Sequence, residues 1–214
     1  MDETGNGGAF MSLIWQYIGN MSGWMLAILP IYLIGRFFYL RQEKKSLKWM
    51  SELVLVVFAL YLVGLTSQTL IPRPTQMMTR GVTTTPFNID WTQVNLIPFR
   101  TIKHYFYIAN LNMDKWGELS ALNLLANIFL FTPIGIFFPL RWKSTRSFLK
   151  VFLLGLWTTC FIEFIQLFIN RSVDIDDVIL NTIGVMIGYG ILCLCLNLKK
   201  VDSISHFLNR TYYE

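Results

Sequence analysis

The sequence predicts an all-α polytopic membrane bundle of about five transmembrane helices, with a long outer loop containing a short interfacial helix. Hydrophobic residues make up 54% of the 214 residues, and charged residues only 14%. Soluble domains usually carry about 25% charged residues. The mean hydropathy is +0.47. So few charges cannot cover a water-facing surface, which excludes a typical soluble enzyme and a disordered chain.

Five segments are long and apolar enough to cross a bilayer, which takes about 20 mainly apolar residues. The first contains Pro30, which a helix in a membrane bundle tolerates. Its start carries no basic residues and no small-residue cleavage site follows, so we interpret it as an uncleaved span rather than a signal peptide. The five expected spans are residues 10–34, 50–71, 121–140, 148–169 and 178–198.

Basic residues in the short loops predict the orientation, because loops rich in Lys and Arg stay in the cytoplasm. The connection from Arg36 to Lys48 holds five bases, the connection after the third span holds four, and the tail holds three. The short loop on the other side holds only Arg171. We therefore expect the N-terminus outside and the C-terminus in the cytoplasm. These clusters also account for the net charge of +5, so we expect no nucleic-acid partner.

The connection from residue 72 to residue 120 is the longest, and we expect it outside. Its centre, Asn95-Leu-Ile-Pro98-Phe99, is apolar enough to return to the membrane surface. Residues 102–111 are rich in aromatic side chains, which rest well at the level of the lipid headgroups. This stretch therefore predicts a short interfacial helix.

Polar side chains in the last three spans occur in pairs on one helix face, three or four residues apart. Such side chains are expensive inside a membrane, and their positions are evidence of function. The predicted orientation places all three pairs at about the same depth near the outer surface. We therefore expect a polar pocket that faces the outer leaflet. The pairs are Asn123 and Asn127 in the third span, Glu163 and Gln166 in the fourth, and Asp177 and Asn181 in the fifth.

The loop before the fifth span places one Arg and three Asp directly above this pocket. One Asp is expected to cap the fifth helix, because a carboxylate accepts from the free N–H groups there. Arg171 is expected to form a bidentate pair with Asp174 or with Glu163. The group resembles a cation or phosphate site. Asp174, Asp176 and Asp177 are the candidates for holding a divalent cation such as Mg²⁺, and no ligand set is firmly assigned.

Glu163 lies in the last turns of its span, where an unpaired carboxylate costs on the order of several kcal/mol. Either Arg171 keeps it charged or it is protonated. Two interpretations stay open for its role. It forms a buried hydrogen bond to Asn127 or Asn181 that only joins helices, or it is a ligand-binding or catalytic carboxylate.

Two features of the last spans indicate packing rather than chemistry. Gly184 and Gly188 have the GxxxG spacing that lets two membrane helices approach closely. Pro133 and Gly135 are expected to bend the third span and to open room beside Asn127.

Four separated blocks between residues 53 and 196 together resemble the VanZ-like family. The family's motif residues correspond to Asn95, Pro98, Asn127, Glu163, Gln166, Arg171, Asp174, Asp177 and Asn181. The blocks are Asn95-Leu-Ile-Pro98-Phe99, then Asn127-Ile-Phe-Leu-Phe-Thr-Pro133-Ile-Gly135, then Glu163-Phe-Ile-Gln166, and then Arg171-Ser-Val-Asp174-Ile-Asp176-Asp177 with Asn181-Thr-Ile-Gly184.

The resemblance implies an integral protein of the bacterial cell membrane, associated with low-level resistance to the glycopeptide teicoplanin. It divides the chain into an extra N-terminal transmembrane helix with a basic cytoplasmic loop (residues 1–49), a VanZ-like membrane core (50–198) and a cytoplasmic tail (199–214). The mechanism is not implied by the family name.

Two functions are compatible with these residues. In the first, the outer pocket binds a membrane lipid headgroup, a lipid-linked cell-wall precursor or the lipoglycopeptide itself. In the second, the protein is an enzyme that modifies a lipid or its phosphate or sugar headgroup. Glu163 and Asp177 are then the catalytic candidates, Glu163 as general base, while Arg171 holds phosphate. No nucleophile stands out, which favours binding. The binding candidates are Asn95, Asn127, Glu163, Gln166, Arg171, Asp174, Asp177 and Asn181.

Overall fold

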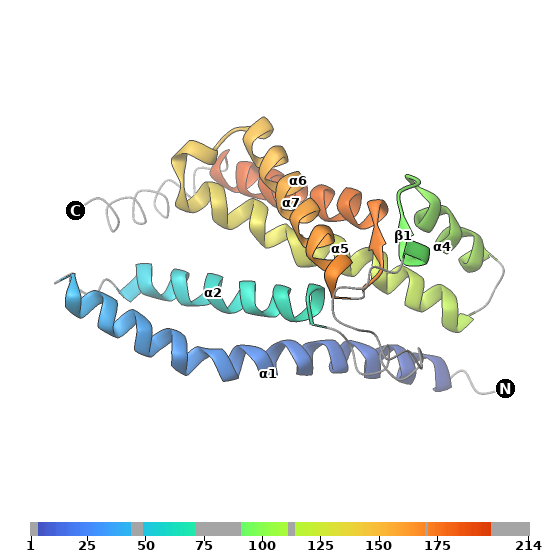
Figure 1. Cartoon of the computed structure of the whole chain (residues 1–214), viewed down its shortest axis with the longest axis horizontal. Helices are drawn as coiled ribbons and strands as arrows, with labels where there is room; N and C mark the ends of the chain where they lie inside the picture. The colour runs from blue at the N-terminus through green and yellow to red at the C-terminus, as the bar shows by residue number, and fades with distance from the viewer. Residues whose placement is uncertain (1–3, 44–48, 72–90, 111–113, 170, 198–214) are drawn as a thin grey trace. The chain divides into compact units, whose positions relative to one another are not determined.

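The computed structural model in Figure 1 describes residues 4–43, 49–71, 91–110, 114–169 and 171–197. Five helices in these ranges are long and apolar enough to cross a membrane. The chain is therefore an all-α, multi-pass membrane protein, as the sequence predicts. The expected tail at 199–214 and residues 72–90 of the long loop lie outside the described ranges. The five helices are α1 (Thr4–Gln42), α2 (Trp49–Thr69), α5 (Asp114–Arg141), α6 (Phe148–Phe168) and α7 (Ile175–Asn197).

The helix bounds agree with the predicted spans to within a few residues, except at two places. Helix α1 has 39 residues and extends beyond both ends of the expected span at 10–34. It continues through Pro30, as predicted, because a helix in a membrane can re-satisfy the one backbone group that proline frees. Helix α5 begins at Asp114, seven residues before the expected start at 121. Its first turns are polar, so a search for apolar runs does not detect them.

The chain divides into two compact units. One comprises residues 69–192 with the first residues of α1, and the other comprises residues 14–68 with the end of α7. The division into domains at residues 49 and 198 stays a prediction.

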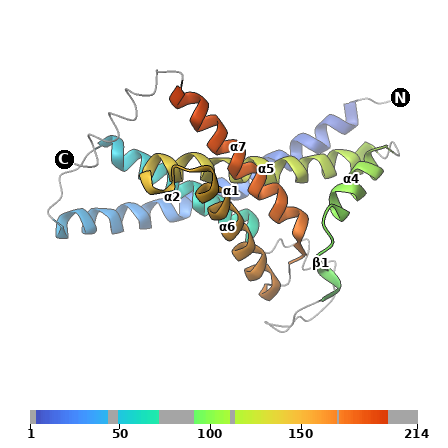
Figure 2. The same cartoon turned by 90° about the horizontal axis from the view of Figure 1, so that it is seen from above.

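Helices α5 and α7 cross in close contact within the first unit (Figure 2). A Cβ atom added at Gly184 would collide with the carbonyl oxygen of Ile128, and one at Gly188 with that of Thr132. On α5, a Cβ atom added at Gly135 would likewise collide with the carbonyl oxygen of Val185 in α7. The predicted packing role of the GxxxG pair is confirmed, because only glycine lets the two backbones come so near.

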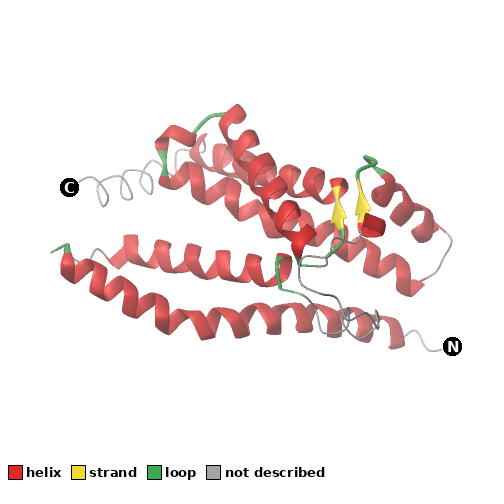
Figure 3. Cartoon of the chain, viewed as in Figure 1, coloured by secondary structure: helices red, strands yellow, loops and turns green. Residues whose placement is uncertain are grey.

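A pair of short strands joins the long loop to the start of α7 (Figure 3). Strand β1 (Val94–Asn95) follows the 3₁₀ turn η1 (Trp91–Gln93) and pairs in parallel with β2 (Val173–Asp174). Helix α4 (Arg100–Asn110) follows directly and confirms the short helix predicted near 102–111. The strands were not predicted, because two residues are too few to show the alternation that marks a strand.

In the second unit, α1 and α2 form an antiparallel hairpin. Arg36 and Glu52 join them near the connection, through Nε–Oε2 at 2.6 Å and Nη2–Oε1 at 2.8 Å. Further along, Gly64 lies against the side chains of Met21 and Met25. The hairpin is thus held by an ion pair at one end and by close packing at the other.

Candidate functional site

Asp174 joins three elements at the start of α7. Its Oδ1 accepts a hydrogen bond from the main-chain N–H of Asp176 at 2.9 Å, so Asp174 is the N-cap of α7. The same oxygen accepts from Nδ2 of Asn95 at 2.9 Å, and Oδ2 accepts from the hydroxyl of Thr101. The prediction that one of the three Asp residues caps the fifth span is confirmed. The side chain also holds β1 and α4 in place.

Asp176 caps a different helix. Its side chain is fully buried and accepts from the main-chain N–H groups of Phe99 at 2.5 Å, Thr101 at 2.8 Å and Ile102 at 3.1 Å. The first N–H groups of a helix lack partners within it, and a carboxylate there is also favoured by the helix dipole. Sequence reasoning proposed Asp176 as a metal candidate and as one of three possible caps of the fifth helix, and did not predict that it caps α4. The sequence held one signal of this role: the capping of α7 needs only one Asp, and the loop carries three.

Glu163 ties the end of α6 to β2. The residue is only 6% exposed, and its Oε2 accepts from the main-chain N–H of Asp174 at 3.0 Å. The hydrogen bond considered from the sequence, to Asn127 or Asn181, is not among those of the described residues. The short strand pair supplies the physical reason, because it brings the backbone of Asp174 over the end of α6.

Asn127 and Asp177 connect α5 with α7. Nδ2 of Asn127 donates to Oδ1 of Asp177 at 2.5 Å. Asn123, the other member of the predicted pair, is exposed. Asn181, one turn after Asp177, is only 3% exposed, and its Oδ1 has no hydrogen-bond partner among the residues that the structure describes.

Gln166 presents a second buried amide oxygen of this kind. Its Nε2 donates to the main-chain carbonyl of Thr69 at 2.8 Å, and the residue is 5% exposed. Within the described part of the chain, its Oε1 accepts no hydrogen bond. Buried polar atoms are nearly always partnered, so two such oxygens in neighbouring helices need a physical explanation.

Arg171, like Gln166, donates to a main-chain carbonyl group near the end of α2. Its Nη1 donates to the main-chain carbonyl of Ile71 at 3.0 Å. For the described residues the structure gives no bidentate pair of Arg171 with Asp174 or Glu163. Ile71 lies two residues beyond the end of α2, so Arg171 donates to a carbonyl group of the segment that follows this helix. The guanidinium of Arg171 also interacts electrostatically with Glu163 and Asp177.

The three Asp residues proposed for a divalent cation turn to different partners. Asp174 faces Asn95 and Thr101, Asp176 faces the start of α4, and Asp177 faces Asn127. Among the described residues, no group of three or more His, Cys, Asp and Glu side chains is arranged to hold a metal ion. The geometry therefore gives no support to that ligand set.

We give the name polar cluster to five of the buried or half-buried polar side chains of α5, α6 and α7. Glu163 of α6 interacts electrostatically with Asp177 of α7, and Asp177 is bonded to Asn127 of α5. These interactions connect the three helices. The remaining predicted residues, Asn95, Asp174 and Arg171, surround the cluster through the hydrogen bonds of β1, β2 and residue 71. The outward-facing pocket itself stays a prediction. The members of the polar cluster are Asn127, Glu163, Gln166, Asp177 and Asn181.

The segment next to the cluster exposes large apolar side chains. Leu96 is 69% exposed and Phe99 51%. Phe99 has φ 62°, in the left-handed region that bulky residues rarely adopt, and its N–H is held by Asp176. On α4, Phe106 and Tyr107 are also exposed. The backbone is thus fixed by Asp174 and Asp176, while its apolar side chains point away from the protein.

Comparison with known protein families gave a match. A family model described as VanZ/LLP1 matches residues 58–196, about two thirds of the chain. No curated protein and no solved structure matches.

Proposed function

The chain belongs to the VanZ-like family, and from this premise we propose that it lowers the susceptibility of a bacterial cell to teicoplanin by binding an amphiphile at the polar cluster. In this proposal the cluster faces the outer leaflet of the cell membrane, with the N-terminus outside and the C-terminus in the cytoplasm. The bound molecule is a lipid headgroup, a lipid-linked cell-wall precursor or the lipoglycopeptide.

The observation that carries the proposal is the pair of buried amide oxygens without donors. Asn181 Oδ1 and Gln166 Oε1 accept no hydrogen bond from the described residues, and the carboxylates of Glu163 and Asp177 lie in the same cluster. A site with this many acceptors suits a ligand that donates O–H or N–H groups. Sugars and amino groups of wall precursors and glycopeptides have this chemistry, so they fit better than a bare phosphate.

The exposed apolar side chains beside the cluster support an amphiphilic ligand. Leu96, Ile97 and Phe99 point away from the protein next to β1, and α4 presents Phe106 and Tyr107. Apolar and aromatic side chains of this kind lie well at the boundary between headgroups and acyl chains. A ligand with a polar head and an acyl chain would contact both surfaces at once.

The experiment compares two asparagines in a teicoplanin-susceptible bacterial host. We expect the wild-type protein to raise the minimal inhibitory concentration of teicoplanin but not of vancomycin, which lacks the acyl chain. Asn181→Leu should abolish this effect, because it removes the unpartnered acceptor. Asn123→Leu is the matched control, since Asn123 is exposed. Equal effects on both drugs, or an active Asn181→Leu protein at normal level in the membrane, would contradict the proposal.

A second function, an enzyme that modifies a lipid or its headgroup, has one observation in its favour. The carboxylates of Glu163 and Asp177 are close enough to interact, as in sites that move protons. Purified protein incubated with radiolabelled membrane lipids decides between the two. A new lipid product that is absent with Glu163→Gln protein would establish the enzyme. If no lipid class is modified, with or without a divalent cation, the enzyme function is excluded and the binding function is retained.

A further inference from the structure

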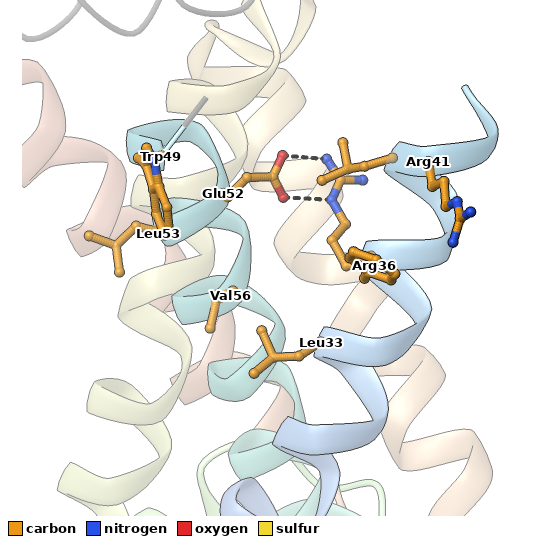
Figure 4. Close-up of a pocket in the computed structure, with 9 residues that line it drawn as sticks. Leu33, Arg36, Arg41, Trp49, Glu52, Leu53 and Val56 are labelled. Atoms are coloured by element: carbon orange, nitrogen blue, oxygen red, sulfur yellow. Dashed lines mark hydrogen bonds and ion pairs between the residues drawn. The ribbon is translucent and has the colours of Figure 1, made fainter. Parts of the chain in front are cut away.

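A cavity of about 400 Å³ lies between α1 and α2 (Figure 4). It is in the unit of residues 14–68, and none of its lining residues belongs to the polar cluster. All of its lining residues fall between Leu33 and Val56, before the family match begins at residue 58. Its volume is in the range of small-molecule sites, roughly 300–1,000 Å³. The cavity is therefore lined by residues that lie outside the family match.

The wall of the cavity is apolar. Leu33 and Phe37 of α1 and Leu53 and Val56 of α2 line it, and Phe37 and Leu53 are more than half exposed. Both helices are apolar enough to cross a membrane at this point. An open apolar cavity on a membrane helix hairpin is in contact with acyl chains, so an acyl chain is the natural occupant of its inner part.

The mouth of the cavity carries an excess of positive charge. Arg36 is held by Glu52 through Nε and Nη2, so that pair is neutral. Its Nη1 takes no part in the pair with Glu52, and its guanidinium lies over the ring of Tyr39 at 5.0 Å. Arg41, exposed at the end of α1, also lines the cavity, and its guanidinium turns away from Glu52 (Figure 4). Guanidinium groups bind phosphate oxygens strongly.

We propose that this cavity binds an anionic phospholipid, with one acyl chain against Leu33 and Val56 and the phosphate at Arg36 and Arg41. The five bases between residues 36 and 48 place this end of the hairpin in the cytoplasm. Anionic lipids of the inner leaflet attract basic segments there. The ligand is therefore taken from the inner leaflet, independently of what the polar cluster binds.

The test uses the full chain in vesicles of equal parts phosphatidylcholine and phosphatidylglycerol, extracted gently and examined by native mass spectrometry. We expect wild-type protein to retain phosphatidylglycerol several-fold more than phosphatidylcholine. Val56→Trp fills the cavity and should reduce retention to background. Val57→Trp is the matched control, because Val57 is the next residue, is 47% exposed and does not line the cavity. It should retain the lipid.

A second pair of variants tests the charge. Arg41→Gln should bring the ratio of the two lipids close to one, whereas Arg41→Lys should preserve the preference. Equal retention in Val56→Trp and Val57→Trp, or no preference in the wild type, would overturn the proposal. A dimer that Val56→Trp dissociates would overturn it too, since a second copy would then fill the cavity. If Val56→Trp does not yield monodisperse protein, Leu33→Trp against the exposed neighbour Ile34→Trp repeats the comparison.

Discussion

Three Asp residues within four positions of the chain have three different tasks. Asp174 caps its own helix and holds Asn95, Asp176 caps the distant helix α4, and Asp177 bonds to Asn127 across to α5. The first task follows from the sequence, because an Asp before a helical run is a common N-cap. The second does not, because it depends on a strand pair that brings α4 to the start of α7.

Removing the charge of Asp176 should loosen α4. In Asp176→Asn, the amide replaces one acceptor oxygen by a donor that faces the N–H groups of Thr101 and Ile102. We expect a loss of about 1–3 kcal/mol in the free energy of unfolding, and faster hydrogen exchange at the first amides of α4. Asp177→Asn is the control and should leave these amides protected. Unchanged exchange in Asp176→Asn would show that the carboxylate does not hold the helix.

Glu163 and Arg171 show how far single residues can be predicted. The low exposure of Glu163 follows from its position in an apolar run, but its partner does not. Its acceptor oxygen is used by the backbone of Asp174, and Arg171 reaches the carbonyl of Ile71. Both bonds are made to main-chain groups. Every residue has such groups, so residue types in the sequence do not indicate which of them Glu163 and Arg171 will reach.

At the level of elements, the helices were predictable, including the short α4 inside the long connection, whereas the strand pair was not. Runs of apolar residues mark all five spans, because lipid imposes the same requirement on each. The polar first turns of α5 and the two-residue strands carry no such signal. The close approach of α5 and α7 was predictable at Gly184 and Gly188, since their spacing places both on one helix face. The close contact of Gly135 in α5 with the backbone of Val185 in α7 could not be derived from the sequence, because it depends on where α7 lies.

A larger side chain at Gly188 should separate these helices. A Cβ there would collide with the carbonyl oxygen of Thr132, so we expect Gly188→Leu to cost about 1–3 kcal/mol or more through overpacking. The loss is measured as a lower midpoint of thermal unfolding in detergent. Gly190→Leu, on the same helix, is the control, because no atom lies within 4 Å of a Cβ at Gly190. A similar midpoint for both variants would contradict the packing described for α5 and α7.

For the whole molecule, the polar cluster and the cavity fall in two different regions of the sequence. The polar cluster and its surrounding hydrogen bonds lie within the family match at 58–196. The cavity between α1 and α2 lies before it. Composition and the five apolar runs were enough to predict a multi-pass membrane protein. They could not predict the cavity, because its wall is made of apolar residues like those of any span.

The central claim is that the polar cluster faces the outside of the cell, and labelling with a membrane-impermeant maleimide tests it most directly. The native residues Cys160, Cys193 and Cys195 are first replaced by alanine, and single cysteines are placed at the exposed residues Ser172 and Ser144, which lie beyond opposite ends of α6. In intact cells we expect Ser172→Cys to be labelled and Ser144→Cys to react only after the membrane is permeabilised. Labelling of Ser144→Cys alone in intact cells would place the polar cluster on the cytoplasmic side and contradict the account.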